Sequence, residues 1–101
     1  MAECKDILEG LANEDTSVIR EAAFQAGTTE CEAAVPKLAE LLGSEHLGVQ
    51  EAAEQALRKI GGPKVVREMI PLLRSENAPQ RNLGMDILRV VGDQDFPSLV
   101  E

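Results

Sequence analysis

Aromatic side chains are almost absent from this chain of 101 residues. Two residues are Phe, and there is no Trp or Tyr. Stacking platforms for single-stranded nucleic acid depend on aromatic rings, so this composition argues against them. The net charge is −8, whereas a duplex-binding protein needs Lys and Arg to displace counterions. Nucleic acid is therefore a disfavoured partner.

Cysteine motifs and long apolar runs are missing as well. Cys4 and Cys31 stand 27 residues apart with no CxxC motif, which predicts two reduced thiols rather than a disulfide framework. No apolar stretch approaches the length that spans a bilayer. The first residues also lack the basic segment and apolar run of a signal peptide. We therefore expect a cytoplasmic protein that does not enter a membrane.

Groups that carry enzyme chemistry are scarce. The one histidine, His46, follows Glu45 in a turn, where a solvated or N-cap residue is favoured over a base or metal ligand. Cys31 falls on the first turn of a predicted helix, where its pKa could be lowered, but a packing role is favoured for it and for Cys4. No phosphate loop or Ser-His-Asp order is present. We expect no catalytic residue, no metal and no cofactor.

What the sequence does contain is one alanine-rich helix repeated three times. Apart from Gln80 in the third copy, each copy has small or apolar residues at positions i, i+3, i+4 and i+7, the spacing of one helical face. The matching sets are Ile19, Ala22, Ala23 and Ala26; Val49, Ala52, Ala53 and Ala56; and Gln80, Leu83, Gly84 and Ile87. These patterns predict three helices, here named B helices, at residues 16–26, 47–60 and 78–91.

A second repeated pattern lies between the B helices and predicts A helices at residues 3–13, 30–42 and 64–74. Its matching sets are Leu8, Leu11 and Ala12; Leu38, Leu41 and Leu42; and Met69, Leu72 and Leu73. No segment alternates with a period of two, so no sheet is expected. The chain is therefore predicted to be all-α, a series of antiparallel helix pairs.

Residues suited to helix ends flank these segments. A glycine follows each B helix, where a left-handed residue is often required: Gly27, Gly61 and Gly92. Two pairs have the spacing of an N-cap and its third helical residue: Thr29 with Glu32, and Asn77 with Gln80. Two prolines suit helix starts, Pro63 and Pro79, and two should kink or delay an A helix, Pro36 and Pro71.

The end of the chain resembles the start of another repeat. The segment "DFPSLVE" at 95–101 matches "AVPKLAE" at 34–40. We expect one domain over residues 1–101, with repeats at about 1–28, 29–61 and 62–92 and a partial fourth at 93–101. The chain would then be part of a longer array, or its last segment would be a cap. The third repeat is the most apolar, so self-association through it is a second expectation.

The pattern V-x-x-A-A-x-x-A-L-x-x-I-G at 49–61, followed by "VVREMIPLL", resembles the HEAT-like repeat family. The period of 30–31 residues is similar to the short repeats of phycobilisome lyases and many bacterial scaffold proteins. The resemblance implies a right-handed α-solenoid with B helices on the concave side. Such modules bind other proteins, so we expect a non-catalytic interaction or scaffold module whose partner is a protein or an adjacent domain.

The B-helix positions opposite the packing stripe are the candidate partner-binding residues: Glu21, Phe24, Gln25, Glu51, Glu54, Gln55, Arg58, Asn82, Met85, Asp86 and Arg89. Residues 1–57 hold twelve acids and three bases, which predicts a basic or mixed-charge partner. The alternative is an ordinary solvated face, with Phe24 and Met85 either contact residues or the edge of the core.

Two other functions remain open at the level of the sequence. The resemblance also allows a subunit or fragment of a lyase-type enzyme that acts on a tetrapyrrole or a modified side chain. Nucleic-acid binding would have to use basic side chains that fall on several helix faces: Arg58, Lys59, Lys64, Arg67, Arg74, Arg81 and Arg89. Both are ranked below protein binding.

Overall fold

The computed structural model describes residues 3–95, and these form helices and turns with no strand. The α-helices are α1 (Cys4–Leu11), α2 (Thr16–Thr29), α3 (Val35–Leu41), α4 (Leu47–Ile60), α5 (Gly62–Met69) and α6 (Ala78–Asp95). Two 3-10 segments accompany them, η1 (Glu32–Ala34) and η2 (Ile70–Arg74). Every predicted helix is present, and the all-α fold class is confirmed. The matched segment "DFPSLVE" lies, apart from its first residue, outside the described residues.

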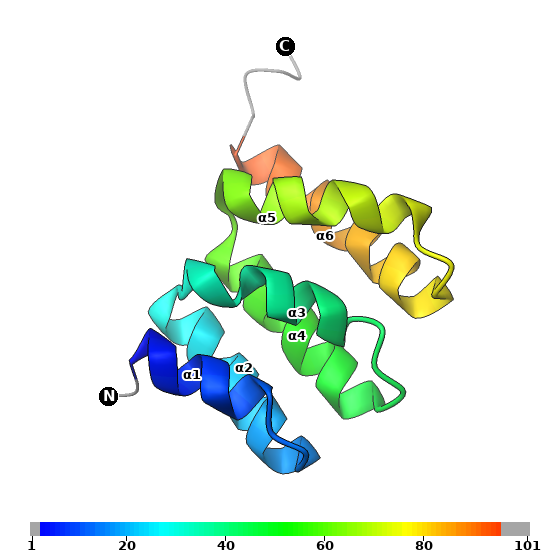
Figure 1. Ribbon diagram of the computed structural model, residues 1–101. Helices are drawn as coiled ribbons and strands as arrows, with labels where there is room; N and C mark the ends of the chain where they lie inside the picture. Colours follow the sequence, from blue (N-terminus) through cyan, green and yellow to red (C-terminus); the bar gives the residue numbers. More distant parts are fainter. Residues whose placement is uncertain (1–2, 96–101) are drawn as a thin grey trace.

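The helices pack as three antiparallel hairpins arranged in two layers (Figure 1). The first hairpin is α1–α2, the second is α3–α4 and the third is α5–α6. Helices α1, α3 and α5 lie in one layer and α2, α4 and α6 in the other. Helix α2 lies side by side with α4, while α4 contacts α6 much less extensively. None of the helices in the described part is both long and apolar enough to cross a bilayer.

The core is built from small residues on α2 and α4 and from large apolar residues on both layers of helices. Ala23, Ala26, Ala53 and Ala56 are each at most 2 % exposed, and their small volume lets α2 and α4 approach closely. Large apolar side chains fill the space between the layers and are fully buried: Ile7, Leu11, Leu38, Leu42, Leu57, Met69 and Ile87. Each such side chain contributes roughly 1.5–3 kcal/mol by leaving water, so packing rather than helix propensity maintains the short helices.

The burial pattern corrects the register proposed for the first A helix. Ile7 is 0 % exposed, whereas Leu8 is half-buried. Ile7 therefore corresponds to Leu38 and Met69, a spacing of 31 residues, and the match of Leu8 to Leu38 was wrong by one position. The B helices do repeat at 30 between the first and second hairpins, because α2 has one more residue before its packing stripe than α4.

Two of the three predicted glycine helix ends are wrong. Gly61 does end α4 with a positive φ of 57°, although its ψ of −163° places it outside the left-handed helical region. Gly27 is instead buried inside α2, and Glu30 takes the left-handed conformation at φ 54°. A Cβ on Gly27 would lie 3.0 Å from the Ala56 Cα, so this glycine serves close packing with α4. Gly92 also lies inside a helix, because α6 continues to Asp95.

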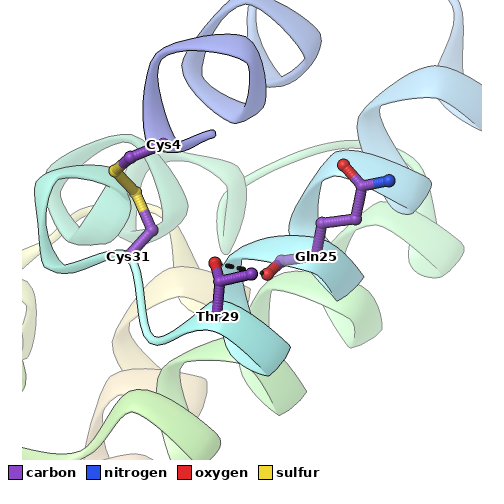
Figure 2. The surroundings of a disulfide bond; sticks show 4 residues. All are labelled: Cys4, Gln25, Thr29 and Cys31. Atoms are coloured by element: carbon purple, nitrogen blue, oxygen red, sulfur yellow. Dashed lines mark hydrogen bonds between the residues drawn. A yellow bond between two sulfur atoms is a disulfide. The ribbon is translucent and has the colours of Figure 1, made fainter. Parts of the chain in front are cut away.

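The predicted caps are half correct. The Gln80 backbone N–H donates to Asn77 Oδ1 at 3.0 Å, so Asn77 is an N-cap. Thr29 is not, because it is the last residue of α2 and its hydroxyl donates back to the Gln25 carbonyl at 2.8 Å (Figure 2). The four prolines act as predicted: Pro63 and Pro79 lie in first turns, and Pro36 and Pro71 lie where α-helix and 3-10 segments meet.

The turn before each B helix is built in the same way, which the sequence did not reveal. A side-chain oxygen accepts a hydrogen bond from the backbone N–H two residues later: Asn13 Oδ1 from Asp15 at 2.8 Å, Ser44 Oγ from His46 at 3.1 Å and Ser75 Oγ from Asn77 at 3.1 Å. These acceptors are 31 residues apart. Such turns fix the backbone at the helix start without long-range contacts.

A disulfide joins Cys4 to Cys31, which overturns the prediction of two reduced thiols (Figure 2). Their Cα atoms are 5.6 Å apart, a normal separation for a disulfide. The two positions meet because α1 and α2 form an antiparallel hairpin that returns the chain to its starting point. Spacing along the sequence cannot show this. The disulfide also removes the argument from free thiols for a cytoplasmic protein.

Candidate functional site

All eleven candidate partner-binding residues are exposed or half-buried on α2, α4 and α6. Phe24 is 57 % exposed and Met85 is 47 % exposed. These two side chains are thus outside the core rather than at a repacked edge. Their exposure follows from their place on helix faces away from the buried residues of α2 and α6.

An open groove of about 470 Å³ runs between α2 and α4. Its lining residues are Ser17, Arg20, Glu21, Phe24, Gly48, Glu51, Ala52, Gln55, Ala56 and Lys59. Four candidates come together there: Glu21, Phe24, Glu51 and Gln55. Gln25, Glu54 and Arg58 lie on the same two helices outside the lining. We refer to this surface as the α2–α4 groove.

Phe24 and Lys59 form the aromatic and cationic part of the groove. The Lys59 Nζ lies 4.9 Å from the centroid of the Phe24 ring, within the range of a cation–π contact. At an exposed position such a contact contributes about 0.5–1 kcal/mol. Lys59 was absent from the candidate list, because only positions directly opposite the stripe were considered and Lys59 lies beside the stripe.

The two groove carboxylates have matching amide partners one helical turn later. The Gln25 amide donates to Glu21 at 3.5 Å, and the Gln55 amide donates to Glu51 at 3.4 Å. The same pair is therefore built on α2 and on α4. Both carboxylates belong to exposed residues, so they are available to a basic group of a partner.

Arg20 closes one end of the groove, and sequence reasoning gave it no role there. A Cβ on Gly48 would lie 3.2 Å from the Arg20 Nε, so the guanidinium of α2 rests over the backbone of α4. The absence of a side chain at position 48 was the signal that could have indicated this contact. Arg20 and Lys59 place positive charge at the edges of the groove, and Glu21 and Glu51 place negative charge between them.

The remaining candidates lie apart from the groove. Glu54 pairs with Arg58 at 2.9 Å, and Asp86 pairs with Arg89 at 3.6 Å. Exposed pairs of this kind contribute at most about 1 kcal/mol. Met85 and the exposed Asn82 are on α6, which takes no part in the α2–α4 groove. The candidate residues therefore do not all belong to one groove.

His46 is an exposed residue that precedes α4, as expected for a turn or N-cap position. Its side chain makes no capping hydrogen bond; its backbone N–H donates to Ser44. Within residues 3–95, no three or more His, Cys, Asp or Glu side chains are grouped so that they could hold a metal ion.

Comparison with known proteins gives one result. A family model described as HEAT repeats matches residues 5–84, which run from α1 into α6. No curated protein and no solved structure gives a significant match. The matched range covers the first two hairpins apart from Cys4, α5 and the first part of α6, and the whole α2–α4 groove.

Proposed function

Since the chain belongs to the HEAT repeat family, we propose that it is a non-catalytic protein-interaction module that binds a partner segment in the α2–α4 groove. HEAT repeats typically form helical scaffolds for protein interactions. The residues of the α2–α4 groove indicate which kind of partner segment it would bind. The proposal applies to a segment of another protein or of an adjacent domain.

The observation that carries this proposal is the exposed Phe24 at a groove that also presents two carboxylates. A Phe that is 57 % exposed gives a partner an apolar anchoring point, because aromatic side chains dominate interface energetics. Glu21 and Glu51 stand at equivalent positions on α2 and α4 and line the same groove. They fit a partner segment that carries two Lys or Arg residues.

Charge would determine which partners are accepted. The α2–α4 groove lies in the acidic part of the chain, where residues 1–57 hold twelve acids and three bases. This field attracts basic segments and speeds their association. Arg20 and Lys59 at the edges disfavour a purely basic segment, so we expect basic residues with one apolar residue between them and an acid at an end.

Selection from a phage-displayed library of random peptides tests the proposal. The 101-residue chain should enrich peptides with two basic residues and an intervening apolar residue. The double variant Glu21→Lys/Glu51→Lys should bind the selected peptides at least about tenfold more weakly, a loss of about 1.4 kcal/mol, measured by fluorescence anisotropy.

A matched control reverses two carboxylates on the A helices, Glu9→Lys/Glu40→Lys, with the same change of net charge. This variant should retain most of the affinity. Equal loss in both double variants would show that net charge alone attracts the peptides. Undiminished binding by Glu21→Lys/Glu51→Lys would exclude the α2–α4 groove as the binding site.

A further inference from the structure

Two rows of residues meet where α2 contacts α4. We call the row on α2 the leading row; its residues are Arg20, Phe24 and Gly27. We call the row on α4 the receiving row; its residues are Gly48, Glu51, Ala52 and Gln55. Arg20 rests over Gly48, and Gly27 packs against α4. The open part of the contact is the α2–α4 groove.

The first hairpin has a receiving row of its own, against which no further B helix of the described chain packs, although Ala22 in this row lies against Gly10 of α1 and is 5 % exposed. Its residues are Val18, Glu21, Ala22 and Gln25, and the last three are identical to Glu51, Ala52 and Gln55 of α4. Together with Asp6, Gly10 and Ser17 they line a second open groove, of about 350 Å³. Val18, at the position of Gly48, is 39 % exposed.

The third hairpin has a leading row that is partly exposed in the described part of the chain. Arg81, Met85 and Leu88 of α6 stand at the positions of Arg20, Phe24 and Gly27. Leu88 is half-buried, whereas Leu57, its counterpart in α4, is 0 % exposed. The α4–α6 contact shows that a leucine fits at this position when another hairpin follows.

The A-helix layer of the third hairpin is open on the same side. Ile70 and Leu73 are 53 % and 39 % exposed, but their counterparts in the second hairpin, Ala39 and Leu42, are 5 % and 0 % exposed. Apolar residues that are covered in the second hairpin are therefore uncovered in the third. Large exposed apolar patches of this kind mark contact surfaces.

The first and third hairpins carry opposite net charge. Residues 3–31 hold seven acids and two bases, a net charge of −5. Residues 62–91 hold five bases and three acids, a net charge of +2. A surface of the third hairpin facing a surface of the first would thus be attracted, although two whole chains of charge −8 repel each other at long range.

We infer that two copies of this chain associate head to tail, with the leading row of the third hairpin of one copy against the receiving row of the first hairpin of the next. The contact continues the interface that already joins successive hairpins within one chain. It is heterologous, because different surfaces meet, so the association continues beyond a dimer, into a ring or an open chain. This inference does not rest on the proposed function, although Glu21 lines both the α2–α4 groove and the receiving row; Val18 and Ile70 lie outside the α2–α4 groove.

Sedimentation velocity of the full 101-residue chain gives the first test. The mean mass should rise above the monomer mass of 10.9 kDa between about 10 µM and about 1 mM protein. Association should weaken as salt is added, because the attraction between exposed charges is screened. A monomer at all these concentrations would overturn the inference.

Two variants, each blocking one surface, distinguish head-to-tail association from a symmetric dimer. Val18→Arg places a base on the receiving row, and Ile70→Glu places an acid on the third hairpin; both sites are exposed. Each variant alone should remain monomeric at concentrations where the parent chain associates, with an association constant at least about tenfold lower. An equimolar mixture should give a dimer and nothing larger, because one intact surface of each kind remains.

Leu47→Glu is the control, since Leu47 is 78 % exposed and belongs to neither row. It should associate like the parent chain, and circular dichroism should confirm that all three variants are folded. A Val18→Arg variant that dimerises alone would indicate a two-fold contact between third hairpins and contradict the inference. A mixture that stays monomeric would contradict it equally.

Discussion

At the scale of single residues, the α2–α4 junction depends on two glycines with different surroundings. A Cβ on Gly27 would meet the Ala56 Cα at 3.0 Å, which is backbone and cannot move aside without shifting α4. A Cβ on Gly48 would meet the Arg20 side chain at 3.2 Å, which is flexible. The same chemical change should therefore have opposite effects on the two sides of one junction.

We expect Gly27→Ala to lower the free energy of unfolding by about 1–2 kcal/mol, because overpacking exceeds the gain in helix propensity. Gly48→Ala should be neutral or stabilising by up to about 1 kcal/mol, since Arg20 can move away. Urea unfolding followed by circular dichroism measures both. A stabilised Gly27→Ala variant would show that α2 and α4 are free to separate.

At the scale of helices and turns, polar side chains connect the third hairpin to the second. The Asn77 amide donates to the Gly43 carbonyl at 3.1 Å, and the Gln80 amide donates to the Ala39 carbonyl at 3.0 Å. Asn77 also caps α6 through its Oδ1. One residue thus starts a helix and attaches it to the preceding hairpin.

Two substitutions separate these roles of Asn77. Asn77→Asp keeps an acceptor for the cap and loses the donor to Gly43, so we expect a loss of about 0.5–1.5 kcal/mol in unfolding free energy. Asn77→Ala loses both, with a total cost of about 1.5–3 kcal/mol. Asp15→Ala, which removes only the α2 cap to Ser17, should cost about 1 kcal/mol. If Asn77→Asp and the parent chain had equal free energies of unfolding, the hydrogen bond to Gly43 would not contribute to stability.

The sequence was sufficient to predict the helices but not how they meet. The i, i+3, i+4 patterns located all three hairpins, because that spacing is a local property of a helix. Gly27 was misassigned, since a glycine at a helix end and one at a close contact look alike in sequence. Lys59 and Arg20 were missed from the groove for a related reason: their neighbours belong to another helix.

At the scale of the whole molecule, the Cys4–Cys31 disulfide restricts the unfolded chain. A bond that spans 27 residues is expected to stabilise the fold by about 3 kcal/mol in the chain-entropy model. Reduction should lower the urea midpoint accordingly. The double variant Cys4→Ala/Cys31→Ala should unfold at a similarly low urea concentration and should not respond to reductant. An unchanged midpoint after complete reduction, checked by thiol titration, would contradict this expectation.

The position of that disulfide also has a kinetic consequence. In a stack of hairpins each hairpin contacts only its neighbours, so the stack is expected to unfold from its ends inward. The covalent bond holds both helices of the first hairpin together at one end. At the other end the third hairpin meets α4 through a smaller contact. Unfolding should therefore proceed in one direction: it should begin at α5 and α6 and reach the α2–α4 groove last.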